Sequence, residues 1–255
     1  MSILEIDNVS RGFGGLVAVD GASLSVEEGA VTSLVGPNGA GKTTLFNLVS
    51  GILPLSAGEI RFEAQPISGL APHVIARRGI GRTFQDPRIF YEMNVLDHVI
   101  AGVRLRGENP LAAVLRDGRT LSQYRKAEEA ARELLASVGL AGRENEKAQD
   151  LSFGEQRYLS IARTLAGNPR LILLDEPTVG LDRNGIGRLS AIVRNLVSQQ
   201  RRTLLIVEHN LDVVFALSDQ IHLLVAGKVV LSGNPAEIRR HPKMIEAYLG
   251  TPHAA

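Results

Sequence analysis

Apolar residues occur along this chain in two patterns, and each pattern predicts a different kind of element. Residues 30–36, 169–177 and 202–210 contain short, almost continuous apolar runs, which are typical of strands covered on both faces. Residues 188–200 and 211–219 instead place apolar side chains at helical spacing. Strands that alternate with helices predict an α/β domain with a largely parallel central sheet.

The N-terminal part of the chain shows a different pattern, in which apolar and polar residues alternate. Residues 3–10 and 17–29 alternate in this way, and residues 58–67 resemble another strand and turn. Alternation with period two is typical of strands that have one buried face. A closing hairpin is predicted within residues 220–233, around Ala226 and Gly227.

Three further stretches are predicted to lie outside the sheets. Residues 104–126 are less regular and carry six basic and two acidic side chains, so we interpret them as an inserted or peripheral segment with a solvated face. From 127 to 138 apolar residues return at helical spacing, and Gly139 stands where a left-handed residue commonly ends a helix. Residues 234–250 predict a helical tail.

Composition narrows the class of protein. The 28 basic and 27 acidic side chains leave a formal net charge of +1, so no nucleic acid is expected as a partner, because such partners usually require a clear basic excess. The chain has no cysteine, which excludes disulfides and thiolate metal sites. No signal-peptide pattern occurs at the N-terminus, and no apolar run approaches the ~20 residues of a membrane span. We therefore expect a cytoplasmic protein.

A phosphate-binding loop is the clearest motif. The segment GPNGAGKT matches G-x-x-x-x-G-K-[ST] at every position, between a predicted strand and a predicted helix. Its backbone amides and the helix N-terminus form a cradle for phosphate oxygens. Lys42 is expected to reach the β- and γ-phosphates, and Thr43 to ligate Mg²⁺. The nucleotide-binding residues predicted here are Gly36, Pro37, Asn38, Gly39, Ala40, Gly41, Lys42, Thr43 and Thr44.

A pair of carboxylates, Asp175 and Glu176, ends the apolar run LILLDE. An aspartate at the end of such a strand is placed to hold Mg²⁺ and its water shell. The neighbouring glutamate is placed to orient or deprotonate an attacking water. His209 follows the next buried strand and emerges at the same sheet edge, where it is a candidate for contacting the γ-phosphate. Phosphoryl transfer needs little beyond such positioning and charge stabilisation.

The motifs occur in an order that resembles the ATP-binding subunits of ABC transporters along nearly the whole chain. Besides the phosphate loop and LILLDE, they are RTFQ with Gln85, the signature LSFGEQ with Ser152 and Gly154, VGLD with Asp182, and VEHN with His209. The resemblance implies ATP hydrolysis, with ATP and Mg²⁺ bound. It also implies that Phe13, upstream of the phosphate loop, stacks on adenine.

The same resemblance implies a fold and its division. The expected fold is the P-loop ABC ATPase fold, with a mostly parallel central sheet, an N-terminal antiparallel β subdomain and a helical subdomain. Residues 1–85 and 165–235 would form the RecA-like core and β subdomain, and 86–164 the helical subdomain with an insert at about 104–126. Residues 236–255 would form a C-terminal helical tail.

Longer segments resemble the LivG-type ATPases of branched-chain amino acid importers. These segments are RGFGGLVAVDGASL, RTFQDPRIFYEMNVLDHV, the terminal AYLG and the stretch between RTFQ and the signature. ATPases of urea or amide importers share much of this pattern, and the lipopolysaccharide-export ATPase is closely similar, so both remain alternatives. Two other classes are less favoured. Soluble ABC ATPases usually carry long coiled coils or two cassettes, whereas this sequence shows one cassette and no sustained heptads. A non-enzymatic regulator would be expected to lack the catalytic carboxylate, which is present here as Glu176.

Partners follow from the resemblance as well. Family members pair head to tail, so ATP at one phosphate loop would be covered by Ser152 and Gly154 of a second ATPase subunit, identical or different. Closure would place Glu176 beside the attacking water and His209 near the γ-phosphate.

Two further residues would transmit the closure of the dimer. Gln85 would bind Mg²⁺ and relay closure to transmembrane permease subunits, and Asp182 would signal across the dimer interface. Residues 86–95, with the aromatics Phe90 and Tyr91, are the expected permease-docking surface. The chain would then lie peripherally on the cytoplasmic side of the inner membrane and serve, indirectly, a periplasmic solute-binding protein.

The signature departs from the common Leu-Ser-Gly-Gly-Gln at Phe153 and Glu155. Ser152 and Glu155 also fit the S-x-x-E capping box, in which each residue's side chain accepts a hydrogen bond from the other's backbone amide. A capped helix start is a positive end suited to anions. We expect Glu155 to point back into its own helix turn and not at a phosphate.

Overall fold

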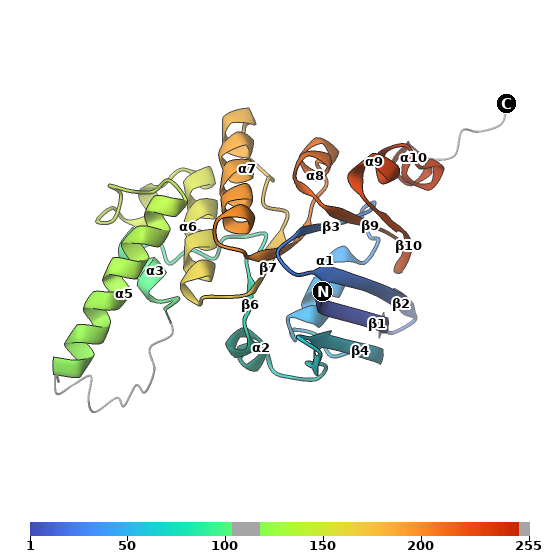
Figure 1. Cartoon of the computed structure of the whole chain (residues 1–255), viewed down its shortest axis with the longest axis horizontal. Helices are drawn as coiled ribbons and strands as arrows, with labels where there is room; N and C mark the ends of the chain where they lie inside the picture. The colour runs from blue at the N-terminus through green and yellow to red at the C-terminus, as the bar shows by residue number, and fades with distance from the viewer. Residues whose placement is uncertain (104–117, 250–255) are drawn as a thin grey trace.

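A six-stranded sheet forms the centre of the molecule (Figure 1). The structure is a computed structural model, and it describes residues 1–103 and 118–249. The strand order is β10-β9-β3-β8-β7-β6. All neighbouring pairs from β9 to β6 run parallel, and β10 at the edge is antiparallel to β9. The bounds are Val31–Val35 (β3), Ile80–Arg82 (β6), Leu171–Asp175 (β7), Thr203–Val207 (β8), Gln220–Val225 (β9) and Lys228–Gly233 (β10).

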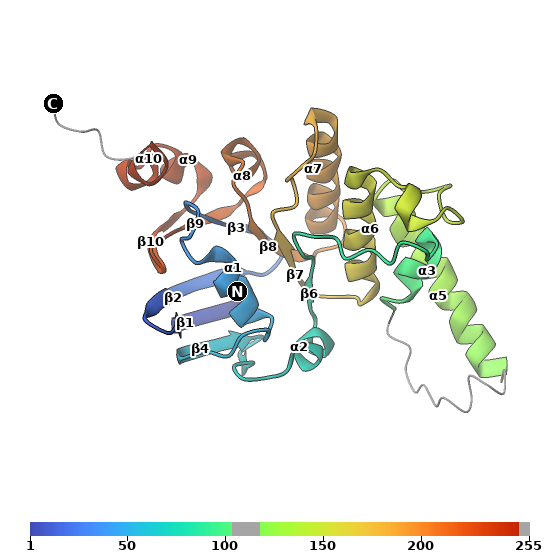
Figure 2. The same cartoon turned by 180° about the vertical axis from the view of Figure 1, so that it is seen from behind.

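A smaller antiparallel sheet covers one side, in the order β2-β1-β4-β5. Helix α1, Lys42–Val49, packs between the two sheets, as Figure 2 shows from behind. Leu45, Phe46 and Val49 of α1 are fully buried in one cluster with side chains of β1 and β7. The strand bounds are Ser2–Phe13 (β1), Leu16–Glu27 (β2), Ala57–Phe62 (β4) and Gln65–Pro66 (β5).

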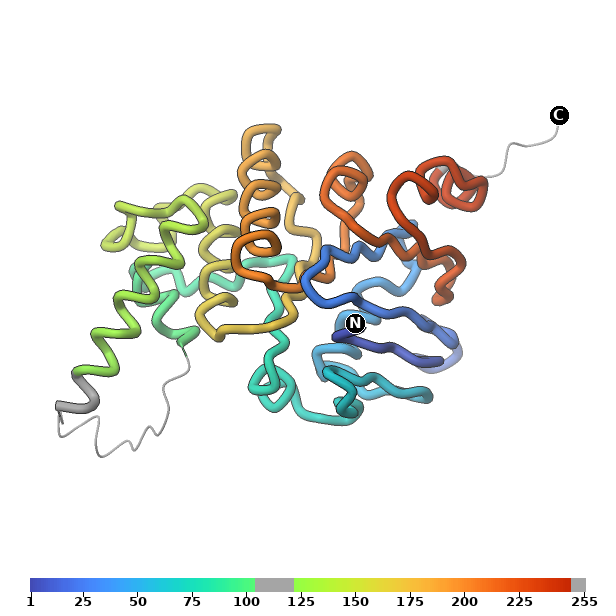
Figure 3. Tube along the Cα trace, viewed as in Figure 1, coloured from blue at the N-terminus to red at the C-terminus, as the bar shows by residue number. Residues whose placement is uncertain are grey.

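A helical part is inserted between β6 and β7. The chain leaves the sheet after β6 and returns through α6 to β7, a path that Figure 3 shows in teal, green and yellow. Val99, Leu135 and Leu159 from three of its helices are fully buried in one cluster, which continues onto side chains of β7 and β8 and so joins this part to the sheet. The elements are α3 (Val95–Ile100), α5 (Gly118–Ser137), η1 (Ala148–Asp150) and α6 (Phe153–Ala166).

The remaining helices border the sheets. Helix α7, Arg183–Ser198, buries Leu189 and Val193 against side chains of β7 and β8. Helix α2 spans Pro72–Arg78, α8 spans Leu211–Leu217, α9 spans Pro235–Arg239 and α10 spans Pro242–Leu249. Within the described ranges, no helix combines the length and apolar character needed to span a bilayer.

The expected α/β architecture with a mostly parallel sheet is confirmed, and the structure adds two local features that the pattern of apolar residues did not predict. Helix α5 begins at Gly118, so residues 118–126, interpreted from their irregular polarity as part of an insert, continue the helix predicted from residue 127. Residues 122–126 are exposed, so no buried apolar stripe marks this turn in the sequence. Residues 104–117 of the expected insert, like 250–255 of the tail, lie outside the described part of the chain.

Strand β6 was also missed by the pattern of apolar residues. It has three residues, Ile80–Arg82, with a glycine in the middle, and so short a run carries no readable period. Pairing with β7 supplies the order that the local sequence lacks. This edge strand matters because it leads directly to Gln85.

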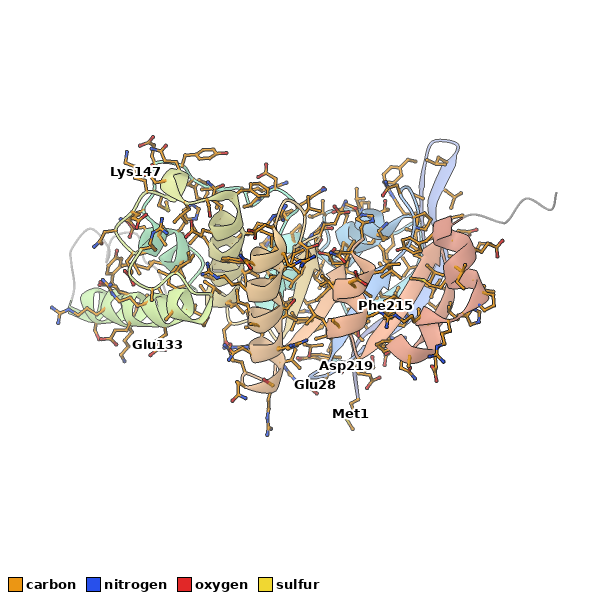
Figure 4. All side chains as sticks on the ribbon, turned by 90° about the horizontal axis from the view of Figure 1, so that it is seen from above. Met1, Glu28, Glu133, Lys147, Phe215 and Asp219 are labelled. Atoms are coloured by element: carbon orange, nitrogen blue, oxygen red, sulfur yellow. The ribbon has the colours of Figure 1, made fainter. Side chains whose placement is uncertain are left out.

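The amino ends and the carboxyl ends of the parallel strands lie on opposite sides of the molecule and are bordered by different residues. Figure 4 shows Met1, Glu28 and Asp219 close together on one side of the molecule. The amide of Glu28 donates to the Met1 carbonyl (2.9 Å), and Asp219 Oδ2 accepts from the Val31 amide (2.8 Å) at the amino end of β3. The loops after β3, β7 and β8 therefore emerge at the opposite, carboxyl edge, where open α/β sheets place their ligands.

The C-terminal helices return to the loop that follows β3. The Tyr248 hydroxyl on α10 accepts a hydrogen bond from the buried Gly36 amide at 2.9 Å. Burial raises the pKa of this tyrosine, and the backbone bond from Gly36 opposes the rise. A residue near the end of the chain thus anchors the first residue of the phosphate-loop motif.

Replacing Tyr248 with phenylalanine should loosen this anchor. Because a buried amide left without an acceptor costs about 1–3 kcal/mol, we expect a lower free energy of unfolding and faster hydrogen exchange at Gly36. Denaturant unfolding and amide exchange measure both. The control is Tyr91→Phe, at a side chain that is 61% exposed. Equal behaviour of the two variants would contradict the anchoring role.

Candidate functional site

The loop between β3 and α1 wraps around the Lys42 ammonium group. Gly41 starts α1 with φ at 103°, and a Cβ there would lie 2.3 Å from the Ala18 carbonyl oxygen, so glycine is required. Lys42 Nζ donates to the carbonyls of Gly36 (2.7 Å) and Pro37 (2.9 Å). Burial lowers the pKa of Lys42, and the negative charges of Glu176 and Asp175 oppose that effect.

A groove of about 380 Å³ opens in front of this loop. It joins the β subdomain, the phosphate loop and the ends of β7 and β8 in one space. Phe13 stands at its edge, 42% exposed, with the Arg11 guanidinium 4.8 Å from its ring centroid. The lining residues are Phe13, Leu16, Ala18, Asn38, Gly39, Ala40, Gly41, Lys42, Thr43, Thr44, Glu176 and His209.

The carboxylate of Glu176 is the meeting point of three motifs. Its Oε1 lies 2.5 Å from His209 Nε2, and its Oε2 accepts from Gln85 Nε2 at 2.8 Å. The side chain is 13% exposed, against 34% for His209. The structure therefore brings together three residues that lie far apart in the sequence and that the motifs singled out separately.

Asp175 lies one residue earlier but outside the groove. It is buried, and its Oδ2 forms an ion pair with Arg82 Nη2 at 2.8 Å. Arg82 also donates to Asn47 Oδ1 (2.8 Å) and Ser50 Oγ (2.7 Å) at the end of α1. Burial lowers the pKa of Arg82, whereas its bond to Asp175 raises it. Sequence reasoning missed Arg82, although it opens the same RTFQ motif that supplied Gln85.

The oxygen donors near the loop suit a hard cation. Thr43 is exposed in the groove, and Asp175 keeps Oδ1 beside the oxygen that pairs with Arg82. No cluster of three or more His, Cys, Asp or Glu side chains occurs in the described residues. That donor set fits Mg²⁺, which is commonly held by one or two protein oxygens together with substrate phosphates.

The signature lines a second hollow, of about 470 Å³, which shares no lining residue with the groove. Here the start of α6 meets the loop before α7. Asp182 caps α7 by accepting from the Gly185 amide at 2.7 Å. The lining residues are Ser152, Phe153, Gly154, Glu155, Tyr158, Gly180, Leu181, Asp182, Asn184, Gly185 and Arg188.

The predicted capping box at the start of α6 is confirmed. Ser152 Oγ accepts from the Glu155 amide (3.4 Å), and Glu155 Oε2 accepts from the Ser152 amide (2.9 Å). The same carboxylate also accepts from the Ser152 hydroxyl (2.7 Å) and pairs with Arg143 (2.7 Å). Burial works against the charged form of Glu155, but these bonds and the Arg143 charge lower its pKa overall.

The aromatic in the signature has a packing partner in the neighbouring loop. Phe153 lies so close to Gly180 that a Cβ there would stand 2.6 Å from the ring. The Arg157 guanidinium also lies over this ring, 4.8 Å from its centroid. Phe153 therefore links LSFGEQ to VGLD, a contact that the motif order alone did not indicate.

Comparison with known proteins agrees with this geometry. Residues 19–179 match the ABC transporter family. The branched-chain amino acid transport ATP-binding protein BraF of Pseudomonas aeruginosa is 40% identical and covers 97% of this chain and 98% of its own. LivG of Salmonella typhimurium is 35% identical with the same coverage.

A solved structure shows the same fold. The ADP conformation of MJ1267, an ATP-binding cassette of an ABC transporter, superposes with a TM-score of 0.84 at 32% identity and covers 98% of this chain and 99% of its own. The antiparallel β subdomain, the mostly parallel sheet and the helical subdomain predicted from the motifs are thus confirmed. The chain belongs to the ABC transporter family and is an ATP-hydrolysing, ATP-binding subunit of the LivG/BraF type.

Proposed function

We propose that the chain energises an importer of branched-chain amino acids by hydrolysing ATP between two ATPase subunits. The observation that carries the pairing is the separation of the two half-sites, because the phosphate-loop groove and the signature hollow share no lining residue. A head-to-tail pair would bring one subunit's groove against the other's hollow. The substrate class rests on relatives named for branched-chain amino acid transport.

Each predicted residue in the groove or beside it receives a role. Lys42 would exchange its bonds to the loop carbonyls for phosphate oxygens. Phe13 would stack on adenine at the exposed edge. Thr43, Asp175 and Gln85 would hold Mg²⁺, which neutralises charge that develops on the transferred phosphoryl group.

Water activation would fall to Glu176. Its carboxylate points into the groove and is bonded to His209 and Gln85. As general base, it would take a proton from the attacking water, and His209 would then be free to contact the γ-phosphate. Ser152 and Gly154 of the second subunit would complete the site.

Residues 86–95 are the proposed contact with the transmembrane permease. Phe90 and Tyr91 are 58% and 61% exposed. The Phe90 amide donates to Nε2 of the fully buried His98 at 2.8 Å, which fixes the segment on the helical subdomain. Burial lowers the pKa of His98, and a neutral ring is the form that accepts this bond. The subunit would thus lie on the cytoplasmic face of the membrane, beneath permeases that receive solute from a periplasmic binding protein.

The Glu176→Gln variant tests the general base. It keeps the side-chain shape but not the basic carboxylate, so we expect kcat to fall at least 100-fold, within the range known for removed acid–base groups. ATP binding should persist, and the variant should accumulate as an ATP-bound dimer in size-exclusion chromatography. Normal turnover by this variant would remove Glu176 from the proposed role.

Lys42→Ala tests the phosphate cradle. The change removes the one ammonium group that the structure places inside the loop, so affinity for ATP should fall at least tenfold, as expected when a charge-assisted bond is lost. Isothermal titration with ATP and with adenosine distinguishes the causes. Adenosine carries no phosphate, so its weak binding should stay the same in the variant.

The transported solute can be tested in cells whose chromosomal copy carries Lys42→Ala. Uptake of labelled leucine, isoleucine and valine at low micromolar concentration should be lost, while urea uptake and cell-surface lipopolysaccharide stay normal. Loss of urea uptake or of surface lipopolysaccharide, with leucine uptake retained, would favour one of the alternative transport systems. Washed membranes should retain the wild-type subunit when its permeases are present.

A further inference from the structure

Glu208 is a buried carboxylate for which the proposed chemistry has no role. It follows Val207, the last residue of β8, directly precedes His209 and is 1% exposed. Its Oε1 accepts from the Thr178 amide at 2.8 Å. Its Oε2 accepts from the amides of His209 (3.0 Å) and Asn210 (3.3 Å). One side chain therefore ties the loop after β7 to the loop after β8 through their backbones.

Arg157 reaches the same place from the signature helix. It is 6% exposed, and its Nη1 donates to the Glu176 carbonyl at 3.3 Å. Burial lowers the pKa of Arg157, while the negative charges of Glu208, Glu176 and Asp86 favour its charged form. Arg157 therefore binds the backbone carbonyl of Glu176, and Glu208 binds the backbone amide of Thr178. A buried cation and a buried anion thus hold the backbone on the two sides of Pro177.

The backbone held in this way is strained. Glu176 has φ at 48°, a left-handed conformation that is uncommon for residues other than glycine. Such a residue keeps this conformation only where its surroundings fix it strongly. The Glu176 amide donates to the Val207 carbonyl at 2.9 Å, Arg157 binds its carbonyl, and Glu208 binds the Thr178 amide two residues later.

We propose that Glu208 and Arg157 are positioning residues that hold Glu176 and His209 in the arrangement needed for water attack. Neither side chain lines the groove, so both act through the backbone. The inference rests on the roles proposed above for Glu176 and His209. It adds that the 2.5 Å contact between these two side chains depends on a carboxylate behind them.

Stability alone gives a weak reason for these charges. A buried charge carries a large desolvation cost, and well-packed apolar residues are often as stable or more stable in its place. A carboxylate offers what an apolar side chain lacks, namely acceptors for three backbone amides from two loops at once. The arrangement therefore favours placement of the loops over stability.

Glu208→Gln is the first test, because it keeps the shape and replaces one acceptor oxygen with a donor. We expect kcat to fall about 10- to 100-fold, a typical loss when reacting groups shift by about 1 Å. KM and the affinity for ATP should change less than threefold, since the phosphate loop is untouched. The control is Glu237→Gln, at an exposed carboxylate that caps α9 by the same kind of bond to a backbone amide.

Amide hydrogen exchange gives a readout that does not depend on activity. In Glu208→Gln, and more strongly in Glu208→Ala, peptides that contain Thr178, His209 and Asn210 should exchange faster. Peptides from the phosphate loop should exchange as in the wild type. If Glu208→Ala does not fold, the glutamine variant alone decides. Unchanged exchange together with unchanged kcat would overturn the proposal.

Arg157→Ala tests the second half, with Arg202→Ala as its matched control. Arg202 also donates to a backbone carbonyl, that of Pro169 at 2.6 Å, and burial also lowers its pKa, but it lies away from the groove. Only Arg157→Ala should lower kcat at constant KM, and Arg157→Lys should restore part of the loss. Equal effects of the two alanine variants would reduce Arg157 to a structural residue.

The same panel separates this inference from the proposed function. If Glu176→Gln retains turnover, Glu176 is not the general base. Glu208 and Arg157 then have no catalytic group to position, so both proposals are wrong. If Glu176→Gln is inactive while Glu208→Gln and Arg157→Ala turn over normally, only the positioning roles are wrong.

Discussion

The buried ion pair between Arg82 and Asp175 is the interaction on which the arrangement of the site depends. It joins β6 to the end of β7, and the further bonds of Arg82 to Asn47 and Ser50 add the end of α1. Removing one partner of such a pair typically costs 3–5 kcal/mol, because the other charge is left buried and alone. Three residues after Arg82, Gln85 reaches Glu176, so the pair also fixes where the helical subdomain leaves the core.

The core and the helical subdomain hold different parts of the proposed site. The core holds the phosphate loop and Glu176 on rigid strand ends, whereas the signature stands on α6, which belongs to the inserted helical part. Arg157 is the direct link that the structure shows between that helix and the backbone of Glu176. The sheet therefore sets the position of the proposed catalytic groups, and the helical subdomain presents the signature that is proposed to face a second subunit.

Much of this was predictable from the sequence, and the reasons are local. Apolar runs such as LILLD become fully buried strands, and the phosphate loop and capping box carry their geometry in a few consecutive residues. The contacts of Arg82, Glu208 and Tyr248 were not predictable. Each depends on groups that meet across a stretch of chain: 93 residues separate Arg82 from Asp175, 30 separate Thr178 from Glu208, and 212 separate Gly36 from Tyr248. The first turns of α5 were missed because exposed helices need no apolar stripe.

The cap at the start of α6 has a consequence for how a pair of subunits would separate. The Ser152 hydroxyl already donates a hydrogen bond to Glu155 Oε2 at 2.7 Å. In a dimer of the kind proposed, the γ-phosphate would replace Glu155 as the acceptor of the hydrogen bond from the Ser152 hydroxyl. An exchanged bond contributes far less net free energy than a new one. The signature would thus recognise the phosphate without holding it tightly, and the two subunits could part easily once hydrolysis has removed it.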